Sequence, residues 1–247
     1  MGQSCLIVDM PLHSIILILM PRIPRSALDG ECCHILNRGN NRGEVFLKDA
    51  DYEAFLKAIA HACIEVPMPV FGYCLMPNHF HLVVQPATAS DLSKWMHWLQ
   101  NTHVRRYHQH YKGSGHVWQG RFKSFPIQSD EHLLTVLKYV ERNQVRAKLV
   151  RKAEQWLWSS ARMWANPGER PAWLADGPLP RPTDWLDQVN AALPNGELEL
   201  LRKCVNRGAP YGGKDWVETV ARLYGLESTI RPRGRPRKEK PEEMGQN

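Results

Sequence analysis

Two histidines stand one residue apart at the head of an apolar run. Residues 74–85 read CLMPNHFHLVVQ and contain His79 and His81. On a β-strand alternate side chains share a face, so both imidazoles project to one side while Phe80 points to the other. Two neutral imidazoles at that separation can chelate one divalent ion. Because H-x-H is a short pattern, the alternative is two half-exposed polar residues on a sheet face.

A second set of polar side chains falls on one face of a predicted helix, residues 130–150. At about 100° per residue the apolar side chains gather on one broad side, and Tyr139 lies opposite them. Asn143 is one turn further along the same surface. The other side chains beside Tyr139 are His132, Thr135, Arg142 and Arg146. This face, which we expect to point away from the core, therefore offers a phenol, an amide oxygen and two guanidinium groups.

These groups suit covalent attack on a phosphodiester. Such an attack needs a nucleophilic oxygen, an ion that polarises the phosphate and cations that hold the backbone. Tyr139 offers the oxygen, and the histidine pair offers a place for an ion. The alternative for Tyr139 is an ordinary surface tyrosine on an amphipathic helix, and helix phase alone does not choose between the two.

Strands and helices must bring these groups together. The apolar patterning predicts strands over 32–37, 70–76, 79–85 and 118–128, and helices over 49–64, 90–111 and 130–150. Strand, helix, two strands, helix, strand and helix form an α+β arrangement. We expect a ferredoxin-like or RRM-like fold with one antiparallel sheet and helices on one face.

The rest of the chain is predicted to surround this catalytic domain, which we place at residues 20–165. A proline-rich linker is expected at 166–196, a small helical DNA-binding-like region at 197–229 and a basic tail at 230–247. Residues 1–19 are interpreted as an upstream extension, with MPRIPR at Met20 as the start of the functional chain. The apolar stretch at 12–20 is much shorter than the roughly 20 residues of a membrane span, so no membrane partner is expected.

The chain is basic, with a formal net charge of +7 and a pI of about 9.2. That balance favours an anionic partner, nucleic acid above all. Residues 102–124 hold five bases and no acid, which are Arg105, Arg106, Lys112, Arg121 and Lys123. Aromatic residues alternate with them, as in surfaces that bind single-stranded DNA. The alternative is that Trp118 and Phe122 belong to the core.

The C-terminal end carries a second basic stretch. Residues 231–240 hold six bases and one acid, and Arg233-Gly-Arg235-Pro resembles an AT-hook. An extended Arg-Gly-Arg segment can enter a narrow minor groove. The alternative is a basic tail without groove preference. The six cysteines form no C-x-x-C pair, so we expect them to be reduced and the protein to be cytoplasmic.

Together these motifs resemble the REP-associated tyrosine transposases, which are HUH single-tyrosine nucleases related to small insertion-sequence transposases. The resemblance runs from Met20 to Lys238. The motifs that carry it are MPRIPR, NRGNNRGEVF, GYCLMPNHFHLVV, SGHVWQGRFKS, YVERNQVRAKLV and GLESTIRPRGRPRK. Many members of this family have Asn-Pro where this chain has Asn143-Gln144.

The resemblance implies a metal-dependent single-strand DNA endonuclease and strand transferase. Tyr139 matches the nucleophile, which would form a 5′-phosphotyrosine link and free a 3′-hydroxyl. His79, His81 and Asn143 match the ligands of an Mg²⁺ or Mn²⁺ ion. The implied partner is single-stranded or hairpin DNA of the REP-type palindromes in a bacterial nucleoid, with Arg142 and Arg146 among the DNA-contacting bases.

Two alternatives stay open. The protein could be a non-catalytic DNA-hairpin binder or regulator that retains the nuclease fold. It could also be a metallohydrolase that uses H-x-H without covalent chemistry, with His132 as a further ligand.

Overall fold

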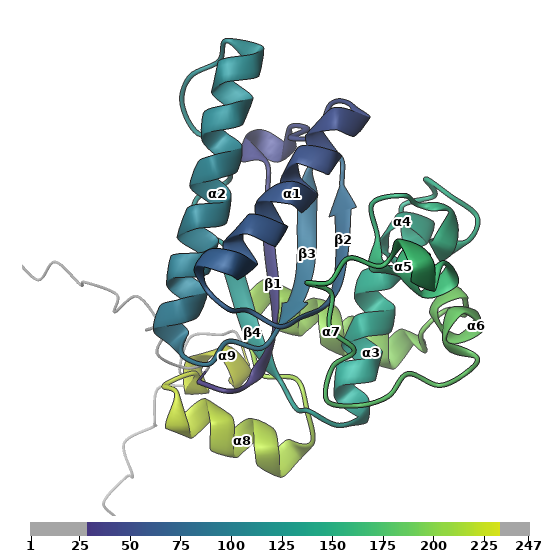
Figure 1. Ribbon diagram of the computed structural model, residues 1–247. Coiled ribbons are helices and arrows are strands. Elements are labelled where there is room, and N and C mark those ends of the chain that lie inside the picture. The colour runs from purple at the N-terminus through teal and green to yellow at the C-terminus, as the bar shows by residue number, and fades with distance from the viewer. Residues whose placement is uncertain (1–28, 233–247) are drawn as a thin grey trace, which may run out of the picture.

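The two histidines lie in a four-stranded antiparallel sheet with the strand order β2-β3-β1-β4. The computed structural model describes residues 29–232 (Figure 1). The strands are β1 (Cys32–Arg38), β2 (Val70–Met76), β3 (His79–Val84) and β4 (Lys123–Ile127). With α1 (Asp49–Glu65) and α2 (Ala89–Tyr111) between them, they give the β-α-β-β-α-β order of a ferredoxin-like fold. The predicted α+β class is confirmed.

Helices cover both faces of this sheet. On one face α1 and α2 pack against Ile35, Phe80 and Leu82. On the other face α3 (Glu131–Glu141) packs against Cys74 and Val83. The expected placement of helices on one face therefore describes α1 and α2 only, and α3 adds a second layer. The physical reason is that β2 and β3 are buried at nearly every position, so each face needs a cover.

The helix predicted over 130–150 is shorter and interrupted. Asp130 caps its start, where Oδ1 accepts the backbone N–H of His132 at 3.0 Å. After α3 ends at Glu141, Arg142 forms a turn and α4 (Asn143–Arg146) adds one more turn. The positive φ of Lys148, 59°, ends the helical segment soon afterwards.

The segment predicted as a linker, 166–196, is folded onto the protein. It contains α6 (Trp185–Asn190), whose Trp185 and Val189 are buried in the same cluster as α3. Before it comes α5 (Ser160–Ala165), and short 3₁₀ turns occur at Asn40–Arg42, Ala153–Gln155 and Pro167–Glu169. The proposed domain boundaries remain predictions, but this stretch does not separate two units as an extended linker would.

Three helices complete the described chain. They are α7 (Asn195–Arg207), α8 (Lys214–Leu223) and α9 (Glu227–Ile230), and α7 lies against β4. Figure 1 shows α7 behind the sheet, opposite α1. No helix within residues 29–232 is long and apolar enough to cross a membrane. The predicted upstream extension, Met20, Arg233 and Arg235 lie outside the described residues.

The strand predicted over 118–128 begins only at Lys123. Trp118 precedes it and forms an isolated bridge with Gly39. Trp118 and Phe122 are 5% and 7% exposed and belong to the core under α1 and α2. Both rings are therefore core residues, and base stacking on them is not available in this conformation.

Candidate active site

The two histidines lie on the inner strand β3, with His79 at its start and His81 two residues further on. His81 lies opposite Leu36 of β1 and Cys74 of β2, whereas His79 begins the strand. Their ring centroids are 5.0 Å apart, on the face that α3 covers. His81 is buried and His79 is partly exposed. The structure thus brings the pair to one face of the inner strand β3, near the end at which His79 is partly exposed.

Hydrogen bonds leave one nitrogen of each imidazole free. His79 Nδ1 donates to Asn78 Oδ1 at 2.7 Å, and the amide orientation is fixed because Asn78 Nδ2 donates to the Arg42 carbonyl. His81 Nδ1 shares a 2.8 Å hydrogen bond with His34 Nε2. In both rings Nε2 is left for another partner. Histidines that bind metals commonly use one ring nitrogen for the ion and the other for such a bond.

Burial keeps both imidazoles neutral at physiological pH. It lowers the pKa of His79 to about 4, with Arg38 and Arg146 adding to the effect. Burial and then the neighbouring His34 and His79 hold the pKa of His81 well below its usual range. Neutral imidazoles keep the lone pair that a metal ligand requires.

The ring of Tyr139, on α3, lies beside the imidazole of His81. Its ring centroid is 6.0 Å from that of His81, with the planes at 88°. The ring is only 5% exposed, so Tyr139 does not lie on an outward face as its helical phase predicted. Within residues 29–232 the Tyr139 hydroxyl has no hydrogen-bond partner, and it is not among the fully enclosed polar atoms.

The reason for this difference lies in the position of α3. Its residues Val136, Leu137 and Val140 are buried together with Tyr139, because the sheet covers one side of the helix and the segment around α6 covers another. A helix enclosed on several sides has no free polar face. The amphipathic pattern could not show that the side opposite the leucines also faces protein.

Arg146 links Tyr139 to the predicted third ligand. Its guanidinium carbon lies 4.3 Å from the Tyr139 ring centroid, and its Nη2 donates to Asn143 Oδ1. Asn143 is buried, and its Nδ2 reaches the Tyr139 carbonyl at 3.5 Å. The amide oxygen of Asn143 is thereby turned toward the same cation that lies over the phenol ring.

A buried carboxylate fastens the end of α3. Glu141 accepts hydrogen bonds from Ser160 Oγ at 2.7 Å and from the indole N–H groups of Trp164 and Trp185 at 2.8 Å each. Burial raises the pKa of Glu141, and Arg181, 3.8 Å away, opposes that rise. These contacts fix the backbone two residues beyond the tyrosine.

The Asn143-Gln144 departure from Asn-Pro has a structural explanation. Gln144 is fully buried, and its Nε2 donates to the carbonyls of Glu141 and Ala153 at 2.7 and 2.9 Å. Its Oε1 accepts from Cys74 Sγ at 3.1 Å. The glutamine therefore ties the short helix α4 to β2 and leaves Asn143 in place.

His132 does not join the histidine pair. Its Nδ1 is 2.7 Å from Asp130 Oδ1 at the start of α3, where Asp130, Glu131 and His132 form a group of potential ligand atoms. Seven residues separate it from Tyr139, which is roughly 10 Å along a helix. His132 is therefore too far along the helix to act as a further metal ligand with His79 and His81.

Three of the basic residues predicted to contact DNA already have partners in the protein, and one of them is Arg146, described above. Arg106 donates to Asp51 Oδ1 at 3.4 Å, near the start of α1. Arg142 donates to the carbonyls of Val189 and Asn190 and so holds α6 against α3. These two guanidinium groups serve the fold.

The remaining basic residues that were predicted to contact DNA, within the part of the chain that the structure describes, are more accessible. Lys123 is exposed on β4, on the same face of the sheet as His81, because both pair with Leu36 of β1. Arg121 is exposed just before it. Arg105 and Lys112 are exposed on and after the last turns of α2, which extends beyond the end of the sheet (Figure 1).

Sequence reasoning missed two residues of this site. Arg38 is exposed and pairs with His79 across β1 and β3, so it adds a cation at the same end of these two strands. His34 is fully buried beside His81, on the neighbouring strand β1. The sequence could have indicated His34, because it is the single ionisable residue other than cysteine in the apolar run CCHILN.

Comparisons with known proteins agree with this geometry. Residues 31–143 match the family model described as "Transposase IS200 like". A protein of Haemophilus influenzae (strain ATCC 51907 / DSM 11121 / KW20 / Rd), whose name assigns it to the REP-associated tyrosine transposases, is 28% identical over 131 residues, which are 49% of this chain and 73% of that protein.

A solved structure shares the fold. It is a REP-associated tyrosine transposase bound to a REP hairpin, and it matches with a TM-score of 0.50 at 21% identity, over 63% of this chain and 92% of that one.

Proposed function

Because residues 31–143 belong to the IS200-like transposase family, we propose that this protein cleaves and rejoins single DNA strands through Tyr139. The observation that carries the proposal is the meeting of Tyr139 with the histidine pair, at 6.0 Å between the rings of Tyr139 and His81. A phenol beside the neutral imidazole of His81, with a guanidinium over its ring, suits nucleophilic attack better than packing alone.

The donor set suits a divalent ion. His79 and His81 would each offer Nε2, and Asn143 would offer Oδ1, which together leave coordination positions for phosphate oxygens. Mixed nitrogen and oxygen donors of this kind fit Mg²⁺ or Mn²⁺ better than a closed structural zinc site. When bound, such an ion would polarise the scissile phosphate.

The chain's own residues carry the rest of the reaction. The Tyr139 oxygen attacks the phosphorus and loses its proton, the bond to the 3′ oxygen breaks, and the 3′ end leaves as a hydroxyl. The phosphate stays on Tyr139 as a 5′-phosphotyrosine. Attack by a 3′-hydroxyl on that link would reverse the step, join the strand and release the tyrosine. Arg146, over the ring, would stabilise the negative charge that develops on the phenol and phosphate.

A basic groove beside the site is a suitable path for a DNA backbone. It lies between β4 and α7, with a volume of about 780 Å³. Its lining residues are Lys123, Glu199, Arg202, Lys203, Asn206, Arg207 and Pro232. Four basic residues and one acidic residue give the groove a positive charge, which favours the binding of phosphate groups. We propose that the stem of a hairpin lies in this groove while its single-stranded flank reaches Tyr139. The solved protein of similar fold is bound to a REP hairpin.

The deciding experiment uses labelled hairpin oligonucleotides with single-stranded flanks, incubated with the protein and Mn²⁺ and resolved on a denaturing gel. We expect a covalent protein–DNA adduct with wild type and with Tyr224→Phe, a matched tyrosine far along the chain. Tyr139→Phe should lose the adduct and still bind the hairpin. An adduct that persists in Tyr139→Phe would overturn the assignment. Hairpin binding without an adduct in wild type would favour the non-catalytic regulator.

A further inference from the structure

His34 lies beside His81, on the neighbouring strand β1, and makes a single hydrogen bond there. It is fully buried on β1, and its Nε2 is 2.8 Å from His81 Nδ1. The two ring planes are within 11° of each other and the centroids are 4.9 Å apart. Such a long centroid separation with so short a nitrogen–nitrogen distance places the rings edge to edge in nearly one plane, as an N–H···N hydrogen bond requires.

This bond decides which nitrogen of His81 can bind an ion. One proton is shared between the two facing nitrogens. If His81 Nδ1 carries it, His81 Nε2 keeps its lone pair, and His34 Nε2 is the acceptor. If His34 Nε2 carries it, a neutral His81 has its proton on Nε2 and cannot bind a metal through that atom.

Packing alone does not account for a histidine at this position. Its ring contacts Phe125 at 4.9 Å and Tyr139 at 6.3 Å between centroids, both edge-on. Its Nδ1 is enclosed and has no hydrogen-bond partner within residues 29–232. A buried polar atom without a partner is unfavourable, and an aromatic hydrocarbon ring would fill the same space without that cost. The His81 contact is the one favourable polar interaction that a histidine adds.

We propose that His34 is a positioning residue that holds His81 in the orientation and tautomer needed to bind a divalent ion through Nε2. In this arrangement His34 accepts at Nε2 and carries its own proton on Nδ1, the atom that has no hydrogen-bond partner within residues 29–232. The inference rests on the proposed metal-dependent function, and it names a residue that acts through His81 without touching the substrate. His79 has an equivalent partner in Asn78, so each imidazole is oriented by a neighbour.

The first test needs no metal. Long-range ¹H–¹⁵N spectra of the imidazoles in the metal-free protein report which nitrogen of His81 is protonated. We expect the Nδ1–H tautomer in wild type and in His34→Gln, whose amide can reach the position of the missing Nε2. In His34→Asn, which is too short to reach His81, and in His34→Phe, the Nε2–H tautomer should gain population. The Nε2–H tautomer in wild type would overturn the proposal.

The second test measures Mn²⁺ binding by electron paramagnetic resonance, with uncut hairpin present in a Tyr139→Phe background. His34→Phe and His34→Asn should bind Mn²⁺ about 10–100-fold more weakly, and His34→Gln should lie close to wild type. His103→Phe is the matched control, because His103 is also buried with an unpartnered Nδ1 but belongs to α2, which packs on the other face of the sheet.

The outcomes separate this inference from the function on which it rests. Unchanged Mn²⁺ affinity in both His34→Asn and His34→Phe, with wild type binding normally, would overturn the role of His34 and leave the metal site intact. Absence of Mn²⁺ binding in the background protein itself would overturn the metal site and this inference with it. Comparing two polar replacements, His34→Gln and His34→Asn, keeps the test decisive if His34→Phe fails to fold.

Discussion

The guanidinium of Arg146 lies 4.3 Å from the centre of the Tyr139 ring and also donates to Asn143 Oδ1. One cation thus contacts both the proposed nucleophile and a proposed metal ligand. A cation over a phenol ring is attracted to the face of the ring, and it stabilises any negative charge that forms at the oxygen. We therefore expect Arg146 to act in the reaction at Tyr139 and not only in the binding of DNA.

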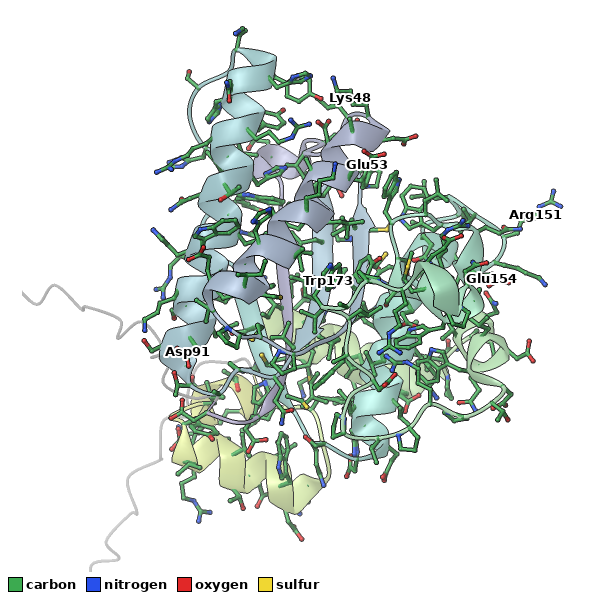
Figure 2. The ribbon with its side chains drawn as sticks, viewed as in Figure 1. Lys48, Glu53, Asp91, Arg151, Glu154 and Trp173 are labelled. Atoms are coloured by element: carbon green, nitrogen blue, oxygen red, sulfur yellow. The ribbon has the colours of Figure 1, made fainter. Side chains whose placement is uncertain are left out.

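Arg146→Gln should therefore slow adduct formation more than it weakens binding. We expect a roughly 10²–10³-fold decrease in the single-turnover rate, comparable with removal of one charge-stabilising donor. Hairpin affinity should change by a few-fold, because the variant holds one phosphate fewer. Arg151→Gln is the control, since this arginine projects into solvent away from the sheet (Figure 2). Equal decreases in rate and affinity would mean that Arg146 only binds the backbone.

The second prediction concerns cooperation between ion and DNA. Arg38 is exposed opposite His79, and Arg146 acts on the same imidazole, so two positive charges oppose a bare divalent ion. A bound phosphate would neutralise them. Mn²⁺ should therefore bind more tightly, by about tenfold or more, when uncut hairpin is present in Tyr139→Phe. Arg38→Gln should strengthen Mn²⁺ binding without DNA. Titrations that give the same Mn²⁺ affinity with and without hairpin would refute this coupling.

How much of the site the sequence predicts depends on the range of the interactions involved. Alternation along β3 is local, so the shared face of His79 and His81 follows from two adjacent positions. The exposure of Tyr139 cannot be derived from adjacent positions in the same way. It depends on α6 and on residues near 160, which approach α3 only in the folded chain. His34 and His81 are 47 positions apart and meet through strand pairing. Periodicity within one segment contains no information about such a pair.

The third prediction is a loss of stability in acid. Burial lowers the pKa of His34 to about 3 and the pKa values of His79 and His103 to about 4. A histidine of the unfolded chain has a pKa of about 6.5, so the unfolded state takes up protons first as the pH falls. The contribution of these histidines to the free energy of unfolding should be constant above about pH 7 and should decline between about 6.5 and 4, by up to about 1.4 kcal/mol per pH unit for each histidine.

Urea unfolding across this pH range provides the measurement. His103→Phe removes one of these groups far from the proposed metal site, so its stability curve should be shallower below pH 6.5 than that of wild type. Curves of equal slope would show that His103 is not held neutral by burial.

The fourth prediction concerns the carboxylate behind the tyrosine. Glu141 is fully buried and accepts bonds from Ser160, Trp164 and Trp185. Glu141→Leu would leave the indole N–H groups of Trp164 and Trp185 without an acceptor and would remove the buried negative charge that faces Arg181. It should lower the free energy of unfolding by about 3–5 kcal/mol. Glu53→Leu, at an exposed position of α1, should change it by less than about 0.5 kcal/mol. Denaturant unfolding measures both, and similar small effects in the two variants would contradict the structural role of Glu141.

The fifth prediction tests the groove between β4 and α7 as the path of the hairpin stem. Arg202 and Lys203 line it from α7, and neither side chain makes a hydrogen bond or ion pair within residues 29–232, whereas Arg207 donates to the Ser228 carbonyl at 2.8 Å. Replacing Arg202 and Lys203 by Gln should weaken hairpin binding about equally for different stem sequences. The slope of log affinity against log salt should fall by about 1 for each phosphate that the variant no longer neutralises. Lys94→Gln, on the first turns of α2, should leave the slope unchanged. Because phosphate contacts carry no base information, a decrease in affinity confined to one stem sequence would instead indicate base readout by α7.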